Sequence, residues 1–438
     1  MTEKSYSVAR LCVSAIVIFV AVSYSLQTFE NCGRKPFLAN DTPSYLEATS
    51  QFYEHNFQPD ALRPFILPAI LGVPMLFGKE EWIFEWAIFL NFAAWLASVL
   101  LVYSSILLLT DRRRMAFWGG VCFACSVGNI LLVYQLLSES IFMLLLASSV
   151  CFFCRFLVKS SRKPHTQLAF SVILFVAASL VRTTTFYLAI VFIILSLLVL
   201  LKNKKIILAF FLATVTLVPI GFQLSQIKKQ FGDIVISYSP YEGIFHYFNA
   251  MVAVIPDHIR DINPQQLAAD WKKEYLLRGE KTPTHTDGTQ NWQQTKQIAS
   301  TEFYEFCRHK PAQVLAAYAI CIGANSCSPH GFIPKLENYR KTAYFEKTKS
   351  LFSIVTAVQN VIYSFGFFIF LGYLLLTERK KMQITSKILL LISTLIVVNI
   401  ISFSGFTTAQ GDRYHLVLVP VFIINFCYFY VKKNIRPV

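Results

Sequence analysis

Long blocks of apolar residues, separated by short polar segments, dominate this sequence. Their lengths match the roughly 20 residues that an α-helix needs to cross the ~30 Å hydrocarbon core of a bilayer. They lack the strict alternation of a half-buried strand and the narrow apolar stripe of a surface helix. We therefore predict an all-α polytopic membrane protein with about ten transmembrane helices. The predicted spans cover residues 8–27, 83–110, 116–133, 140–158, 166–181, 184–201, 205–223, 351–376, 384–404 and 414–431.

Two shorter apolar stretches are not counted as spans. Residues 64–77 carry three prolines, and a stretch of about 14 residues cannot cross the bilayer as a helix. We predict a broken helix there, at the outer interface or packed against protein. Residues 312–326 are also short, and a crossing there would move every later basic cluster to the other side. We therefore predict a second interfacial helix.

Composition and charge narrow the class of protein. Of the 438 residues, 55% are hydrophobic and 15% are charged, with a formal net charge of +15. A soluble domain would carry roughly 25% charged residues. Most basic residues lie in short runs between the apolar blocks, as the positive-inside bias produces. This favours anionic membrane lipids as their partner and excludes nucleic acid.

The basic runs also predict the orientation in the membrane. If the N-terminus lies in the cytoplasm, these runs all fall on the cytoplasmic side, and both termini are cytoplasmic. The runs are Arg112–Arg114, Lys159–Lys163, Lys202–Lys205, Arg379–Lys381 and Lys432–Arg436. No retention signal is evident, so we expect an integral protein of a bacterial inner membrane.

Three regions follow from this topology. They are an N-terminal transmembrane module at 1–223 with a first extracytoplasmic loop at 28–82, a large extracytoplasmic loop at 224–350, and C-terminal transmembrane helices at 351–438. We predict helices near 263–277 and 292–308 in the large loop. Its histidines show no metal-ligand spacing, so we expect solvated surface side chains. They are His246, His258, His285, His309 and His330.

The conspicuous charged residues gather at the outer boundary of the membrane. Asp41, Glu139, Arg182 and Arg413 all lie there, on segments far apart in sequence, while the spans themselves are almost free of charge. A transporter usually places ionisable groups near the bilayer midplane. Charges gathered at one interface favour chemistry on a lipid headgroup, with the active site facing the periplasm or exterior.

Asp41 opens a segment that predicts an amphipathic helix. Thr42 and Pro43 follow it, and Tyr45 and Phe52 lie on one apolar face. One interpretation is that Asp41 or Thr42 caps the helix, with proline in its first turn. The other is that Asp41 is a general base that takes a proton from an acceptor hydroxyl.

Several short motifs follow Asp41 in a characteristic order. They are Arg63-Pro64 before a proline-rich stretch that ends in Phe77-Gly78, Leu137-Ser138-Glu139, Leu180-Val181-Arg182, and Asp412-Arg413-Tyr414 with Pro420. This order resembles the GT-C superfamily of membrane glycosyltransferases, which use polyprenyl-phosphate-linked sugars as donors. The bacterial aminoarabinose and protein-mannosyl transferases are the most similar members.

The resemblance implies a GT-C-like fold and assigns Asp41 as the catalytic base. It also implies a polyprenyl-phosphate-linked sugar as donor, a glycan, lipid or protein as acceptor, and inversion at the anomeric carbon. Many members have a second acidic residue directly after the base. Here that position is Thr42, so no motif supports a divalent metal, and no other cofactor is expected.

The leaving polyprenyl phosphate needs positive charge in the transition state, and arginine suits bidentate phosphate contact. The candidates are Arg63, Arg182 and Arg413, with Lys335 and Arg340 of the large loop as outsiders. The three arginines are also consistent with anchors at helix ends. Glu139 either pairs with an arginine, caps the next span, or orients a substrate, and Tyr45 and Tyr414 are supporting candidates.

Two other functions also fit the pattern of spans. An O-antigen-type polymerase or ligase has a large outer loop and depends on arginines in late loops, which would shift the site to Arg340 and Lys335. A lipid-linked-sugar flippase, or another transporter, would need a polar path through the bilayer, and the uncharged spans disfavour it.

Overall fold

The computed structural model describes residues 7–28, 39, 41–54, 57–158, 163–333, 336, 343–378, 380, 382–408 and 413–434. Within these residues the chain is helical, with one isolated bridge between Thr284 and Gln290 and no strand. The helices are α1 (Val8–Ser25), α3 (Thr42–Glu54), α4 (Ile66–Leu71), α5 (Ile83–Thr110), α6 (Arg113–Ala124), α7 (Val127–Leu131), α8 (Glu139–Leu157), α9 (Pro164–Val181), α10 (Phe186–Lys202), α11 (Ile206–Phe231), α12 (Ser239–Gly243), α13 (Asn249–Val254), α14 (Pro264–Glu280), α15 (Trp292–His309), α16 (Pro311–Cys327), α17 (Ala343–Thr377), α18 (Ile384–Ser404), α19 (Arg413–Leu416) and α20 (Val419–Asn434).

Eight of the described helices are long and apolar enough to cross a membrane. They contain α1, α5, α8, α9, α10, α11, α17 and α18. The third predicted span is divided, because α6 and the segment Val127–Tyr134 are bent by 59°, and together they make a ninth candidate. The last predicted span contains α19 and the 16-residue α20, which begins beside Pro420. The prediction of an all-α polytopic membrane protein is confirmed.

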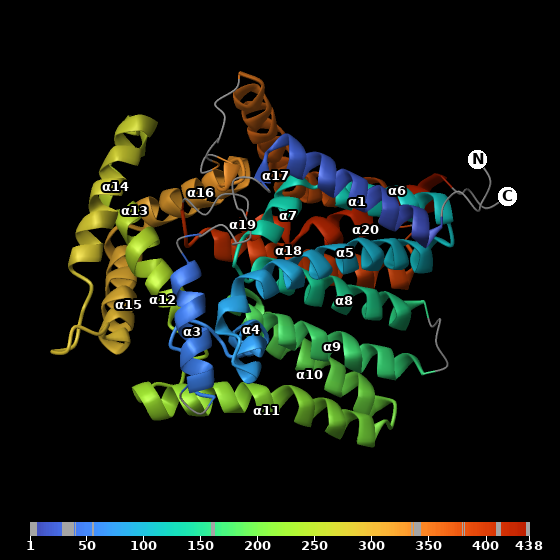
Figure 1. Ribbon diagram of the computed structural model, residues 1–438, viewed down its shortest axis with the longest axis horizontal. Helices are drawn as coiled ribbons and strands as arrows, with labels where there is room; N and C mark the ends of the chain where they lie inside the picture. Colours follow the sequence, from blue (N-terminus) through green and yellow to red (C-terminus); the bar gives the residue numbers. More distant parts are fainter. Residues whose placement is uncertain are drawn as a thin grey trace.

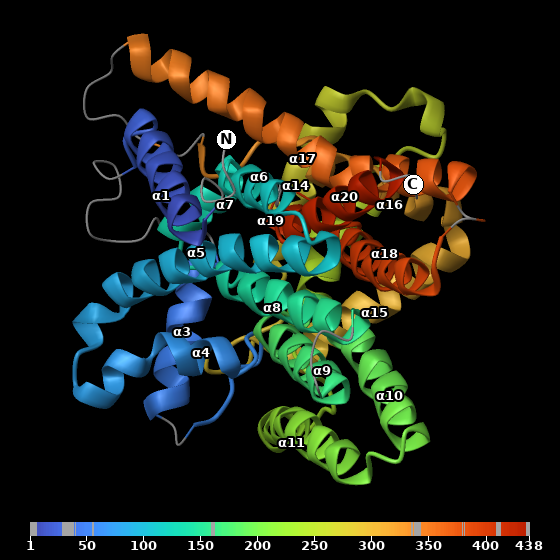
Figure 2. The same ribbon diagram turned by 90° about the vertical axis from the view of Figure 1, so that its right-hand side faces the viewer.

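The long helices lie side by side, with both termini at one end of the bundle and α12 to α15 at the other (Figure 1). Figure 2 shows α5, α8, α9, α10 and α11 as a row of successive neighbours, and each touches the next. α1, α6, α17 and α20 lie on the other side of α5. Large buried side chains such as Trp95, Phe142 and Phe175 fill the interior.

The first loop contains α3 and a broken helix. α4 ends at Gly72, and a 3-10 helix, η2 (Val73–Phe77), follows directly. A Cβ at Gly72 would lie 2.2 Å from the Tyr53 ring of α3, so glycine is needed for this close approach. The Tyr53 hydroxyl donates a 2.6 Å hydrogen bond to the Ala69 carbonyl of α4. The broken helix predicted at 64–77 is therefore observed, and it holds α3 in place.

The large loop folds around a small apolar core of its own. Phe248, Met251 and Val252 pack against Cys321 of α16, with Leu267 of α14. α14 and α15 match the helices predicted near 263–277 and 292–308. Arg278 on α14 is buried and pairs with Glu274 at 3.0 Å and Glu302 at 2.7 Å, which ties α14 to α15.

α16 joins this loop to the membrane helices. Asn325 donates hydrogen bonds to the carbonyls of Ser404 and Thr407, at 2.9 and 2.8 Å, and accepts one from Asn360 of α17 through its own carbonyl. His330, which follows α16, is fully buried against Gln135, with 2.9 Å between the two nitrogens. The expectation of a solvated surface histidine is therefore wrong at His330, because the chain turns inward beneath α17.

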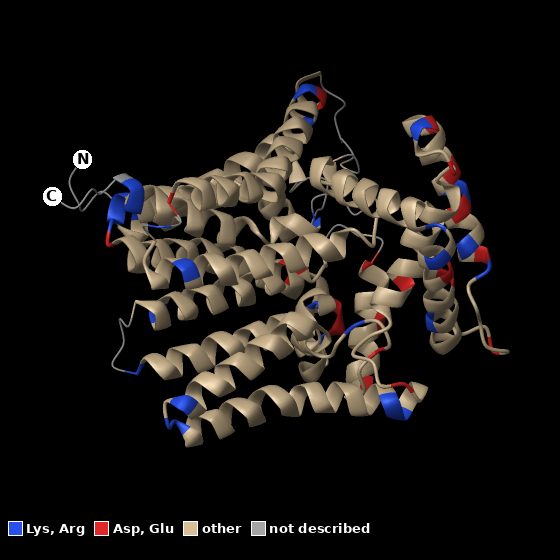
Figure 3. Ribbon diagram, turned by 180° about the vertical axis from the view of Figure 1, so that it is seen from behind, with Lys and Arg blue, Asp and Glu red and all other residues tan. Residues whose placement is uncertain are grey.

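Charge divides the molecule into two ends. Lys and Arg side chains gather at the helix ends near the two termini, whereas mixed charges cover the large loop at the opposite end (Figure 3). Two helices are longer at the loop end than the predicted spans. α11 continues to Phe231, and α17 begins already at Ala343.

Candidate functional site

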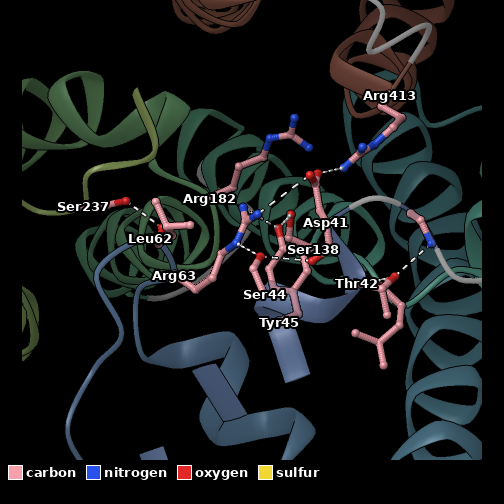
Figure 4. Close-up of polar contacts among 12 residues, drawn as sticks. Asp41, Thr42, Ser44, Tyr45, Leu62, Arg63, Ser138, Arg182, Ser237 and Arg413 are labelled. Carbon is pink, nitrogen blue, oxygen red and sulfur yellow. Dashed lines mark hydrogen bonds and ion pairs between the residues drawn. The ribbon is translucent and has the colours of Figure 1, made fainter. Parts of the chain in front are cut away.

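Five charged residues from distant segments meet at the loop end of the membrane helices. Asp41 precedes α3, Arg63 lies before α4, Glu139 is the first residue of α8, Arg182 follows α9, and Arg413 is the first residue of α19. All except Glu139 line one cavity of about 310 Å³, together with Tyr45 and Tyr414. Figure 4 shows Asp41 between the Arg63 and Arg413 side chains, with Arg182 above them.

Arg413 connects the two carboxylates of this cluster. Its Nη2 lies 2.9 Å from Asp41 Oδ2, and its Nε donates a 2.8 Å hydrogen bond to Glu139 Oε1. Asp41 and Glu139 lie 98 positions apart in sequence, and Arg413 comes from the far end of the chain. The start of α19 therefore helps to fix the geometry of the first loop.

The two carboxylates differ in their access to the cavity. The Glu139 side chain is 0% exposed, whereas that of Asp41 is 28% exposed. Glu139 is enclosed by Arg182 and Arg413, each 2.8 Å from its Oε1, so it can hold arginines but cannot reach a substrate. Asp41 is the carboxylate that can touch a bound molecule.

The environment of Asp41 keeps it ionised. Burial raises the pKa of Asp41, but the positive charges of Arg413 and Arg63 outweigh it, and the pKa falls below the ordinary value for aspartate. The Asp41 side chain bonds Arg413, while the helix start is closed by the Thr42 hydroxyl, which accepts from the Ala39 N–H at 2.9 Å.

Arg182 has hydrogen-bonding capacity to spare. Its Nη1 forms a 2.8 Å ion pair with Glu139 Oε1. The guanidinium stacks over the Tyr414 ring at 4.3 Å, and the side chain lines the cavity. Because Glu139 engages only one edge of the planar guanidinium, its other N–H groups are placed to bind an anion.

Arg63 is held by the first loop. Asp60 Oδ1 accepts hydrogen bonds from the backbone N–H groups of Leu62 and Arg63, at 2.8 and 3.0 Å, which shapes the turn. The Arg63 Nε donates to Ser44 Oγ at 2.9 Å, and its guanidinium lies 4.3 Å above the Tyr45 ring. Its distance to Asp41 Oδ1 is 3.9 Å, so this ion pair is looser than that of Arg413.

Tyr45 links the first loop to α8. Its hydroxyl donates a 2.9 Å hydrogen bond to Ser138 Oγ, beside Glu139, and receives a 3.4 Å contact from Arg63 Nη1. Tyr45 is buried, so these contacts help to position the Arg63 guanidinium and the start of α8, where Glu139 lies.

The opposite wall of the cavity comes from the large loop, and the sequence did not predict that it meets the charged cluster. Glu242 on α12, His246 and Tyr247 on the π-helix η6 (Ile244–Phe248), and Tyr275 on α14 line the same cavity. Burial raises the pKa of Glu242 to about 7, although Arg63 acts against it, and burial lowers the pKa of His246 to about 4. In the sequence, the aromatic segment from Tyr238 to Gly243 has two interpretations, as a sugar-binding segment or as part of an interfacial aromatic belt.

Lys335 and Arg340 lie outside the described residues. In the part of the chain that the structure describes, no group of three or more His, Cys, Asp or Glu side chains is arranged to hold a metal ion.

Comparison with known proteins adds a solved structure of similar fold. No family model and no curated protein sequence matches the chain. The structure of ArnT from Cupriavidus metallidurans in the apo state is similar at 11% sequence identity and a TM-score of 0.37, and the match covers 95% of this chain and 77% of that one. A likeness of this size does not assign a function, which has to be inferred from the site itself.

Proposed function

We propose that this protein is a membrane glycosyltransferase that moves a sugar from a polyprenyl-phosphate-linked donor to a glycan, lipid or protein acceptor, with inversion. One observation carries the proposal. A partly exposed, ionised carboxylate, Asp41, shares a cavity with Arg182, whose guanidinium has N–H groups beyond the one that pairs with Glu139. The cavity lies at the ends of the membrane helices, where a lipid-linked headgroup would be presented.

In this mechanism Asp41 acts as the general base. It accepts the proton of the acceptor hydroxyl while that oxygen attacks the anomeric carbon. The bond between the anomeric carbon and the phosphate oxygen breaks, and the polyprenyl phosphate leaves with the electron pair. A single displacement inverts the configuration, and no general acid is needed because the leaving phosphate is already a stable anion.

The arginines stabilise the charge that develops on the leaving phosphate. Three arginines face two carboxylates in the cluster, which leaves one positive charge in excess for the donor. Arg182 offers its unused donors, and the donor phosphate competes with Asp41 for Arg413. When the phosphate binds beside Arg413, its negative charge offsets that cation at Asp41, so the pKa of Asp41 rises and it becomes a stronger base.

Glu139 acts on the arginines and does not contact the substrate. Because it is fully enclosed, it holds Arg182 and Arg413 against their mutual repulsion and fixes the direction of their donors. Such preorganisation is the main source of electrostatic catalysis, since the groups need not reorient when charge develops.

The orientation in the membrane is part of the proposal. The basic helix ends and both termini would lie in the cytoplasm of a bacterial inner membrane, with the cavity facing the periplasm. Anionic lipids would contact the basic ends. The flippase alternative gains no support, since the apolar windows of the described spans hold at most two charged residues each. The polymerase or ligase alternative rests on Lys335 and Arg340, which lie outside the described residues.

Sugar transfer by the purified full chain in nanodiscs tests this function. Radiolabelled polyprenyl-phosphate sugars are offered with an envelope extract as acceptor, and the product anomer is determined by NMR. We expect a product of inverted configuration from at least one donor. Retention of configuration, or translocation of donors across vesicles without a new glycosidic bond, would contradict the proposal.

A further inference from the structure

The carboxyl group of Glu242 has no explanation in the fold. It faces the cavity of Asp41 and Arg63, yet its side chain makes no hydrogen bond or ion pair with any other described residue. Glu242 is half-buried on the cavity wall, and a carboxyl group that faces a cavity without a protein partner is open to a ligand. Glu242 is also absent from the chemistry proposed above, which uses Asp41 as the only base.

The surroundings of Glu242 differ from those of the arginine cluster. Tyr247 and Tyr275 lie beside it on the cavity wall, with ring centroids 5.3 Å apart, and Tyr275 stacks on Trp271 at 5.4 Å. The burial that raises the pKa of Glu242 to about 7 leaves a large protonated fraction near neutrality. A protonated carboxyl group both donates and accepts hydrogen bonds, as sugar hydroxyls do.

The size of the cavity restricts what can lie against this wall. At about 310 Å³ it is at the small end of ligand pockets, which range from roughly 300 to 1,000 Å³. It therefore suits the polar head of a lipid-linked donor, with the polyprenyl chain outside. If the phosphate lies at Arg182 and Arg413, the attached sugar extends along the remaining wall.

We infer that Glu242, together with Tyr247 and Tyr275, forms the subsite of the transferred sugar, and that Glu242 hydrogen-bonds a hydroxyl group of that sugar. This inference rests on the proposed transferase function. The arginine wall then recognises the phosphate that every donor shares, whereas the loop wall selects the sugar. Polar groups that pair with a substrate hydroxyl discriminate strongly, because they are left unpaired by the wrong ligand.

Binding to the full chain in nanodiscs at pH 6 separates the two walls. The probes are citronellyl phosphate and its glucosyl and mannosyl esters, measured by tryptophan fluorescence. We expect Glu242→Ala to weaken binding of the preferred sugar ester about tenfold and binding of citronellyl phosphate by less than about twofold. Glu242→Gln, which keeps a donor and an acceptor, should stay close to wild type. Arg182→Ala should weaken all three probes.

The matched control is Glu280→Ala, which removes an exposed carboxylate from the end of α14 and should change nothing. Equal losses for the phosphate and its esters in Glu242→Ala, or no loss for any of them, would overturn the subsite. If Glu242→Gln binds as weakly as Glu242→Ala, and the wild type binds an amino-sugar ester tightly, the hydroxyl contact is overturned. Glu242 would then recognise a cationic group of the sugar. If the expected binding pattern is found without any sugar transfer, the subsite stands and the transferase function fails.

Discussion

The two walls of the cavity are built on opposite principles. The arginine wall, called the membrane wall from here on, is formed by Asp41, Arg63, Arg182 and Arg413, with Glu139 behind them. Both of its carboxylates are paired, and Glu139 contacts Arg182 and Arg413 at 2.8 Å each. On the loop wall Glu242 makes no hydrogen bond or ion pair with another described residue, and Tyr247 and Tyr275 line the same cavity. The membrane wall lacks only an anion to balance its charge. The loop wall lacks a neutral polar group to pair with Glu242.

This difference indicates where binding energy and selectivity come from. Buried ion pairs contribute little net stability but hold their groups rigidly, which suits a fixed task such as phosphate stabilisation. An unpaired polar group favours the ligand that supplies its missing hydrogen bond and disfavours a ligand that does not, which suits discrimination between sugars. The predictions below test this contrast, first on the membrane wall and then on the loop wall.

The largest effect is expected from removing the hub of the membrane wall. Glu139→Ala leaves Arg182 and Arg413 without their shared counter-charge, and breaking a buried pair costs about 3–5 kcal/mol. We expect a clear fall in the thermal unfolding midpoint in detergent. Adding Arg182→Met to Glu139→Ala should recover part of the loss, because one uncompensated charge is then gone. Unchanged stability in the single variant would show that the pairing is not structural.

Loss of the spare phosphate donor should act on catalysis more than on stability. Arg182→Ala removes a preorganised cation, and we expect the kcat/KM for transfer to fall about 100-fold. Arg182→Lys keeps the charge but not the planar fork, so it should recover only part of the rate. Arg155→Gln, at the other end of α8, serves as control. Equal rates for Arg182→Ala and this control would exclude Arg182 from the site.

The pH profile compares the walls directly. Asp41 has a lowered pKa and must be ionised, so activity should be present throughout the neutral range and be lost only at acid pH below the ordinary aspartate pKa. Burial raises the pKa of Glu242, Arg63 lowers it, and Asp41 and Asp60 raise it. Glu242 therefore ionises as the pH rises through about 7. Its negative charge then opposes the developing phosphate charge, so kcat/KM should fall several-fold above that pH.

Glu242→Gln isolates the second limb of this profile. The amide cannot ionise, so the alkaline fall should disappear while the acid limb remains. A profile with the same alkaline limb in wild type and Glu242→Gln would assign that limb to another group.

The smallest effect should come from a single hydrogen bond at the base of the site. Tyr45→Phe removes the 2.9 Å bond to Ser138, which is worth about 1 kcal/mol. We expect kcat to fall less than about tenfold, with little change in KM. A loss comparable to that of Arg182→Ala would mean that Tyr45 takes part in the chemistry itself.

The sequence was informative about the membrane wall for a physical reason. A charge at the end of a long apolar block, such as Glu139 or Arg182, is costly unless it is paired or functional, so it stands out against its surroundings. Arg413 was conspicuous for the same reason, whereas Asp41 stood out at the start of the amphipathic segment of the first loop. Which arginine pairs with which carboxylate could not be predicted, because these contacts join segments up to 372 positions apart.

The loop wall gave no such signal. Between 224 and 350 polar and charged residues are common, so Glu242 looks like its neighbours until the packing around η6 and α14 encloses it. His330 shows the same limit, since its burial depends on how α16 meets α17. The fold class was predictable from the spans, but the division of α6 from α7 and of α19 from α20 depends on local packing that periodicity does not record.

The most direct measurement is sugar transfer by Asp41→Asn, compared with wild type and with Glu47→Gln, which neutralises an exposed carboxylate on the same helix α3. With the preferred donor in nanodiscs, we predict a loss of about 100-fold or more in kcat for Asp41→Asn, with donor binding retained, and no loss for Glu47→Gln. Transfer by Asp41→Asn at the wild-type rate would contradict the central claim that Asp41 is the base.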